Sequence, residues 1–225
     1  GYLLVFLMLW AIEAWMTWES GRHLSGVGHA LRGTLLILFI WKLDVLLRIK
    51  EPWTSGQIAE PSDGANPTRP GLPDHGEFGR FERLLYLAYG WLLVGSALDL
   101  YLGLSRIAGY PDPIDADALR HVFLAGFASS LLIGMAPRMV PGFVQQRQVA
   151  YPGLVNVTFW LWGLATFCRI LPLLFAPIIP ASEVVSNAIA NAFAASGAIG
   201  WLAIAVLMVN LLATLRRSEA ATAEV

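Results

Sequence analysis

The sequence predicts an all-α fold, a polytopic transmembrane helical bundle with about six spanning helices in this chain. The 225 residues are 56% hydrophobic and only 14% charged, whereas a soluble domain carries about 25% charged residues. The apolar residues also fall in long runs, and a spanning helix needs about 20 mostly apolar residues. Because hydrocarbon offers the backbone no water, each run is expected to form a helix.

Six runs are long enough to cross a bilayer. They are residues 1–18, 28–48, 81–104, 117–140, 153–176 and 184–214. The stretch after the second run is rich in Pro, Gly and Asp, which is typical of a flexible linker. The predicted organisation is two helices over 1–48, a cytoplasmic loop over 49–80, a four-helix region over 81–215 and a cytoplasmic tail over 216–225. Because the chain opens without Met inside an apolar run, we interpret the first helix as truncated and expect more helices upstream.

The Lys and Arg residues predict the orientation of the bundle. Most of them lie after the second run, after the fourth run and in the tail, and cytoplasmic loops are the basic ones. Both ends of the chain are therefore expected in the cytoplasm, as a multi-pass protein of the bilayer. The net charge of -1 gives no support for a nucleic-acid partner.

With this orientation, polar residues from all six apolar runs fall at one depth, in the outer leaflet, whereas Lys42 and Asp44 lie in the inner half of the second run. The set comprises Glu13, His29, Arg32, Asp99, Arg120, His121, Arg169, Asn187 and Asn191. An ionisable group in a spanning helix costs several kcal/mol and indicates a functional site. The layer predicts a buried polar site near the outer surface. In the alternative interpretation, Glu13 and Asp99 pair with Arg32 or Arg169 and only hold helices together.

Two histidines at similar depth on different helices are what a bis-imidazole haem requires. His121 is the leading candidate for an axial ligand and His29 a weaker second. Arg32, Arg120 and Arg169 would bind the haem propionates, and the same imidazoles suit copper or another metal. In the structural alternative, His121 is an interfacial histidine bonded to a backbone carbonyl or a headgroup, and His29, which follows "SGVG", lies in a loop.

Residues 118–172 resemble the later half of the NnrS family. The matching positions are Arg120, His121, Gly126, Phe127, Gly134, Met135, Arg138, Pro141, Phe143, Arg169 and Leu171. The resemblance implies a bacterial inner-membrane protein of about twelve helices, containing haem and copper and linked to nitric oxide, of which this chain would be the second half. The chain departs from the family at "PGFVQQR", where some members have G-H-T-G-R, so a ligand supplied there would be missing.

The predicted function is therefore binding of haem, a metal or both in the outer leaflet, within nitric oxide or respiratory metabolism. No hydrolase or nucleotide-binding motif is present, and enzymatic turnover stays an open question. The rival is a cofactor-free structural or accessory subunit of a larger respiratory or photosynthetic complex, with its polar layer joining helices. A transporter is disfavoured because the sequence indicates no broken helix near the midplane.

Overall fold

The fold of the described chain is entirely helical. The computed structural model describes residues 22–47, 78–144, 146, 148–175 and 183–223. Its elements are α2 (Arg22–Leu43), α3 (Glu82–Ile107), α4 (Ala116–His121), the π-helix η1 (Val122–Ser129), α5 (Ser130–Phe143), α6 (Pro152–Phe175) and α7 (Glu183–Ala223). The all-α prediction is confirmed for these ranges.

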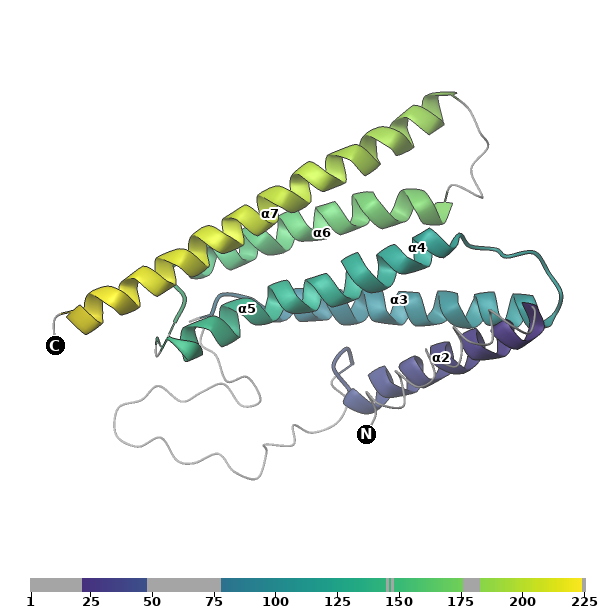
Figure 1. Cartoon of the computed structure of the whole chain (residues 1–225), viewed down its shortest axis with the longest axis horizontal. Helices are drawn as coiled ribbons and strands as arrows, with labels where there is room; N and C mark the ends of the chain where they lie inside the picture. The colour runs from purple at the N-terminus through teal and green to yellow at the C-terminus, as the bar shows by residue number, and fades with distance from the viewer. Residues whose placement is uncertain (1–21, 48–77, 145, 147, 176–182, 224–225) are drawn as a thin grey trace.

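Five helical rods are long and apolar enough to cross a membrane: α2, α3, the continuous α4–η1–α5 rod, α6 and α7. The prediction of about six is therefore confirmed for five, and the expected first helix over 1–18 lies outside the described residues. Consecutive rods run in opposite directions (Figure 1). One end of the bundle, on the right in Figure 1, collects the start of α2, the end of α3, α4, the end of α6 and the start of α7. We call it the polar end.

Helix α2 differs from its predicted bounds of 28–48. It begins at Arg22 and ends at Leu43, and Asp44 follows with a left-handed backbone (φ 53°). The first turns are held to α3 by a tertiary contact, because Arg106 Nη1 donates a 2.6 Å hydrogen bond to Ser25 Oγ. His29 consequently lies inside a helix, and its alternative placement in a loop is wrong.

Glycines let the backbones of α2 and α3 approach closely. A Cβ added at Gly103 would lie 2.4 Å from the Ala30 nitrogen, and one at Gly33 would lie 2.6 Å from the Ser96 carbonyl oxygen. Small residues at such a crossing allow dense van der Waals packing, which is what drives helix association in lipid. Helix α3 is the central rod, since α2 packs on one side of it and the α4–η1–α5 rod packs on the other (Figure 1).

The α4–η1–α5 rod spans the predicted 117–140 segment, but it is not a plain α-helix. Residues Val122–Ser129 form a π-helix, a wide form that appears often at functional sites. The Ser129 hydroxyl donates to the Leu124 carbonyl, five residues earlier, at 2.9 Å. Gly126 allows the rod to lie against Trp91 of α3, because a Cβ there would approach Trp91 Cγ to 2.7 Å.

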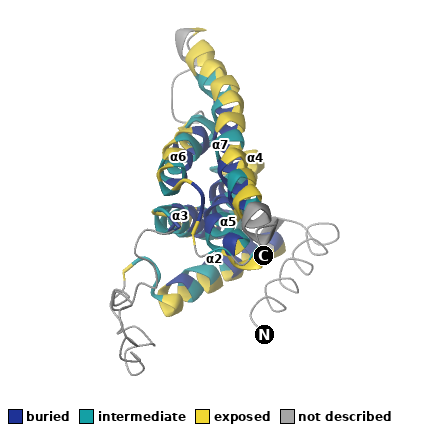
Figure 2. Cartoon of the chain, turned by 90° about the vertical axis from the view of Figure 1, so that its left-hand side faces the viewer, coloured by how far each residue is buried: buried dark blue, intermediate teal, exposed yellow. Residues whose placement is uncertain are grey.

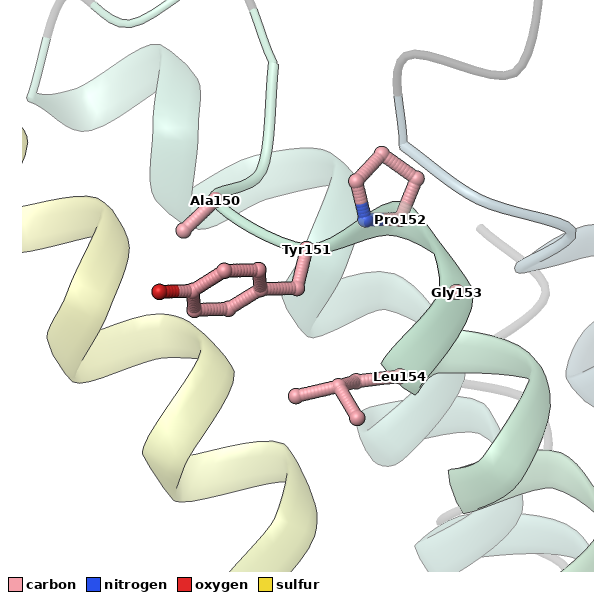
Figure 3. A pocket seen from close by; sticks show the side chains of 5 residues that line it. All are labelled: Ala150, Tyr151, Pro152, Gly153 and Leu154. Atoms are coloured by element: carbon pink, nitrogen blue, oxygen red, sulfur yellow. The ribbon is translucent and has the colours of Figure 1, made fainter.

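Helices α6 and α7 form a long antiparallel hairpin. At its far end, Asn210 of α7 accepts from the Tyr151 backbone nitrogen at 2.8 Å and donates to the Tyr151 carbonyl at 3.0 Å. Thr214 accepts from the Ala150 nitrogen at 2.9 Å. Tyr151 lines an open, mainly apolar hollow beside α7 together with Ala150, Pro152, Gly153 and Leu154 (Figure 3). These bonds fix the connection between α5 and α6 to α7.

The outward faces of the helices are exposed (Figure 2). Many of the exposed side chains are large and apolar, as the hydrocarbon of a bilayer requires. Leu132 and Trp201 are both 73% exposed. The 41 residues of α7 correspond to about 60 Å of helix at 1.5 Å per residue. This is about twice the hydrocarbon thickness of roughly 30 Å, so α7 extends beyond the apolar layer.

We predict that Gly103→Ala lowers the free energy of unfolding and that Gly90→Ala does not. The new methyl group at Gly103 meets backbone atoms of α2, and such overpacking costs about 1–3 kcal/mol. Gly90 lies on the same helix with nothing within 4 Å of its added Cβ, so alanine there gains helix propensity of up to about 1 kcal/mol. Thermal unfolding in detergent, followed by circular dichroism, measures both. Equal melting temperatures for the two variants would contradict the close crossing.

Candidate functional site at the polar end of the bundle

The predicted polar residues that the structure describes lie at the polar end, and five of them form two groups on different helices. The first, which we call the ion-pair group, consists of His29 and Arg32 on α2 and Asp99 on α3. The second, the aromatic group, consists of His121 at the end of α4, Arg169 on α6 and Phe193 on α7. No hydrogen bond, ion pair or ring contact of His121, Arg169 or Phe193 reaches the ion-pair group within the described ranges.

The ion-pair group centres on the Asp99 carboxylate, which is fully buried. Arg32 binds it with two nitrogens, Nε to Oδ2 and Nη2 to Oδ1, each at 2.6 Å. Parallel charge-assisted bonds of this kind are among the strongest available to a protein. In the alternative interpretation Asp99 pairs with Arg32 or Arg169, and the structure shows the pair with Arg32. Glu13, the other acid of that interpretation, lies outside the described residues.

His29 adds a third contact to the same carboxylate. Its Nδ1 lies 2.7 Å from Asp99 Oδ1, and because a carboxylate only accepts, Nδ1 must carry the proton. The Arg32 Nη2 atom lies 3.0 Å from the same Nδ1, a distance that follows from both donors converging on Oδ1. His29 and Arg32 are thus engaged in joining α2 to α3. The structure supports a structural role for them more directly than the predicted axial and propionate roles.

His121 occupies the end of α4, where the rod changes from α to π geometry. Its Nδ1 lies 2.7 Å from the Asp117 carbonyl oxygen. A carbonyl accepts only, so Nδ1 is the protonated nitrogen and the lone pair of the neutral ring belongs to Nε2. This bond is the one expected in the structural alternative. It is also the arrangement by which metal-binding histidines are usually oriented.

Phe193 connects the other two members of the aromatic group. Its ring lies 5.9 Å from the His121 ring in an edge-on arrangement, at an interplanar angle of 66°. The Arg169 guanidinium carbon lies 3.7 Å from the centre of the same ring, which is close cation–π geometry. The side chains of three helices therefore meet around one aromatic ring.

Arg120, the third predicted propionate residue, lies outside both groups. Its Nη1 donates to Asp117 Oδ1 at 2.8 Å, and both side chains are well exposed, at 70% and 63%. Asn187 and Asn191 on α7 are exposed as well. Of the three arginines, only Arg169 shares a cluster with His121. Within the described ranges, no group of three or more His, Cys, Asp or Glu residues comes together.

Two residues of this region were not predicted from the sequence. Phe193 lies in an apolar run, where nothing local distinguishes it from its neighbours. Trp91 is 5% exposed, and its Nε1 is the buried side-chain polar atom with no hydrogen-bond partner in the part of the chain that the structure describes. Trp91 packs with Val122 of η1 and Ile170 of α6, the residues that directly follow His121 and Arg169.

No family model, curated protein or solved structure matches the chain. The resemblance to the NnrS family therefore stays a prediction that depends on the residues of the α4–η1–α5 rod and of α6. The two groups at the polar end are the features of the described residues that bear on function.

We predict that Asp99→Asn destabilises the protein strongly. The substitution leaves the buried Arg32 guanidinium without its counter-charge, and breaking a buried pair in this way costs roughly 3–5 kcal/mol. Asp112→Asn is the matched control, because the Asp112 side chain is 38% exposed in its pair with Arg106, and exposed pairs contribute less than about 1 kcal/mol. Denaturant or thermal unfolding compares the two. Similar losses would show that the Asp99 pair does not hold α2 to α3.

Proposed function

We propose that the chain is a helical membrane protein of the NnrS-like kind that binds haem where α4, α6 and α7 meet. His121 would hold the haem iron, and Arg169 would pair with a propionate. The proposed setting is the outer leaflet of a bacterial inner membrane, within nitric oxide or respiratory metabolism. The observation that carries the proposal is the bond from His121 Nδ1 to the Asp117 carbonyl, because it leaves Nε2 as the ligating nitrogen of an oriented ring.

The residues of the aromatic group fit haem in their chemistry. One imidazole suffices for haem iron in several protein classes, since the macrocycle itself supplies four nitrogen ligands. Arg169 offers a cation beside the histidine, already oriented by its stacking on Phe193. Phe193 adds an apolar, aromatic surface next to the imidazole. When bound through one histidine, haem would supply an iron position for a diatomic ligand, and His29 would be needed only for bis-imidazole ligation.

Copper is a separate part of the predicted function. His29 and His121 are its candidate ligands, but they lie in two groups that no contact joins within the described ranges. A haem at His121 would use one of these groups, whereas a metal ion held by both histidines would need both. We therefore place haem before copper in the proposal.

A cofactor-free accessory subunit is the second candidate, and the ion-pair group favours it. Asp99, Arg32 and His29 satisfy one another and join two helices, as expected of interhelical contacts in lipid. The two candidates differ in the aromatic group, because only haem binding would use His121 Nε2 as a ligand and the Arg169 charge as the partner of a propionate. The exposed apolar faces would then bind lipid or a larger complex.

The first test is the visible absorption spectrum of the detergent-purified protein, oxidised and reduced with dithionite. We expect a Soret band, and α and β bands on reduction, that are lost in His121→Ala and partly restored by added imidazole. Restoration separates loss of a ligand from loss of the fold. Folded wild-type protein that shows no Soret band after incubation with haemin would refute the haem proposal and favour the accessory subunit.

The second test compares two arginines of the polar end. Arg169→Gln removes the cation beside His121, and we expect it to weaken haemin binding about tenfold, the equivalent of one charge-assisted hydrogen bond. Arg120→Gln removes an exposed arginine paired with Asp117, and its effect should stay within twofold. Titration of the Soret band gives both affinities. A larger loss of haemin affinity in Arg120→Gln than in Arg169→Gln would contradict the role of Arg169 and indicate a propionate site on the exposed side of α4.

A further inference from the structure

The end of the bundle opposite the polar end is basic. The start of α3, the end of α5, the start of α6 and the end of α7 lie there, on the left in Figure 1. These parts of the chain hold one acid, Glu82, and five arginines, which are Arg80, Arg83, Arg138, Arg216 and Arg217. The apolar span of α6 begins here at Pro152 and that of α7 ends here at Arg217. Lipid headgroups are expected at the level where spans begin and end.

The hollow beside Tyr151 lies at this basic end and has a volume of about 490 Å³. It is lined by residues 150–154, from the connection between α5 and α6 and from the first turn of α6. The Tyr151 and Leu154 side chains both point toward α7 (Figure 3). The lining is mainly apolar, so it offers little to a free ion but suits a hydrocarbon chain.

Arg217 brings a positive charge to the edge of this hollow. Asn210, Thr214 and Arg217 are spaced by four and three residues, so they share one face of α7. Asn210 and Thr214 bond the backbone of the connection, and the Arg217 guanidinium carbon lies 5.2 Å from the centre of the Tyr151 ring, within cation–π range. The Arg217 side chain is exposed and makes no hydrogen bond or ion pair with the described residues. Within that part of the chain, its donors are left for a ligand.

We propose that this hollow binds an anionic phospholipid. The phosphate pairs with Arg217, and one acyl chain lies along the apolar lining. Both parts of the ligand are needed to match the site, because a free phosphate gains nothing from the apolar lining and a zwitterionic lipid brings a second cation next to Arg217. Guanidinium and phosphate form strong charge-assisted bonds. The site does not depend on the proposed haem, which belongs to the other end of the bundle.

The first test measures the binding of single lipids to the full chain in detergent by native mass spectrometry. Dioleoyl phosphatidylglycerol is compared with dioleoyl phosphatidylcholine, which has the same acyl chains and no net charge. We expect the wild-type protein to bind phosphatidylglycerol about fivefold more tightly, the scale of one basic residue facing an anionic lipid, and Arg217→Gln to lose this preference. Arg216→Gln removes the same charge at the neighbouring exposed position and should keep it. Equal losses in the two variants would overturn the proposal, because they would indicate charge without a site.

The second test fills the hollow. Gly153 lines it, and a Cβ added there meets no atom within 4 Å, so Gly153→Leu should fold with an unchanged melting temperature. We expect it to weaken binding of both lipids about tenfold, roughly the contribution of two buried methylene groups. Gly142→Leu is the matched control, because Gly142 at the end of α5 is equally open but lies outside the lining. Unchanged lipid binding in Gly153→Leu would contradict the role of the hollow.

Competition identifies the occupant. Lysophosphatidylglycerol, which keeps one acyl chain, should displace the bound phosphatidylglycerol, and inorganic phosphate should not. Displacement by inorganic phosphate would overturn the proposal in favour of a site for phosphate alone. Equal binding of phosphatidylglycerol and phosphatidylcholine to the wild-type protein would also overturn it, and would leave the hollow to a segment of a second copy or of another protein. None of these results bears on the Soret band, so this inference and the proposed function fail separately.

Discussion

The two-point contact between Arg32 and Asp99 is the interaction on which the arrangement of the first described helices depends. Both nitrogens of the fork lie 2.6 Å from a carboxylate that has no exposure at all. In lipid, neither charge can be left alone, because the bilayer interior solvates ions poorly. Glycines at the same crossing bring the backbones of α2 and α3 close enough for the short side chain of Asp99 to be reached. Packing and charge therefore specify one register together.

The contacts of the aromatic group differ in kind from those of the ion-pair group. Its contacts are a hydrogen bond to a backbone carbonyl, an edge-on ring contact and a cation–π stack. None of these neutralises the guanidinium of Arg169, whereas Arg32 is neutralised by Asp99. A cation held by a ring keeps its charge for an anionic ligand. This difference separates the group that joins helices from the group that we propose binds haem.

The sequence predicted the helices far better than the contacts between them. Long apolar runs determine which segments span, so five of the six expected helices appear in the described ranges. The bounds of α2 were missed because polar residues such as Ser25 enter the helix through a bond to Arg106, which hydropathy cannot indicate. The π-helix was missed for a similar reason: its widening depends on hydroxyl bonds and on packing against Trp91.

For the candidate site too, the sequence predicted where residues lie along the helices but not which of them contact one another. Depth along the helices brought His29, Arg32, Asp99, His121 and Arg169 to one end of the bundle, as the alternation of helix direction predicts. Depth does not give rotation about the helix axis, and rotation decides which residues meet. The rotation of each helix turns Asp99 toward α2 and leaves the Arg120 side chain exposed. It also brings Phe193 between His121 and Arg169.

Helix α3 provides the physical link between the two groups. It carries Asp99, which holds α2, and Trp91, which packs against η1 and α6. Any shift of α3 along its axis would alter both the ion pair and the contact of the Trp91 indole. The reason is that Gly95 and Gly126 bring α3 and the π-helix into contact so close that not even a Cβ would fit between them. A buried salt bridge contributes little net stability compared with a well-packed apolar alternative. Its role here is to fix position, because holding α3 in register also holds Trp91 against η1 and α6.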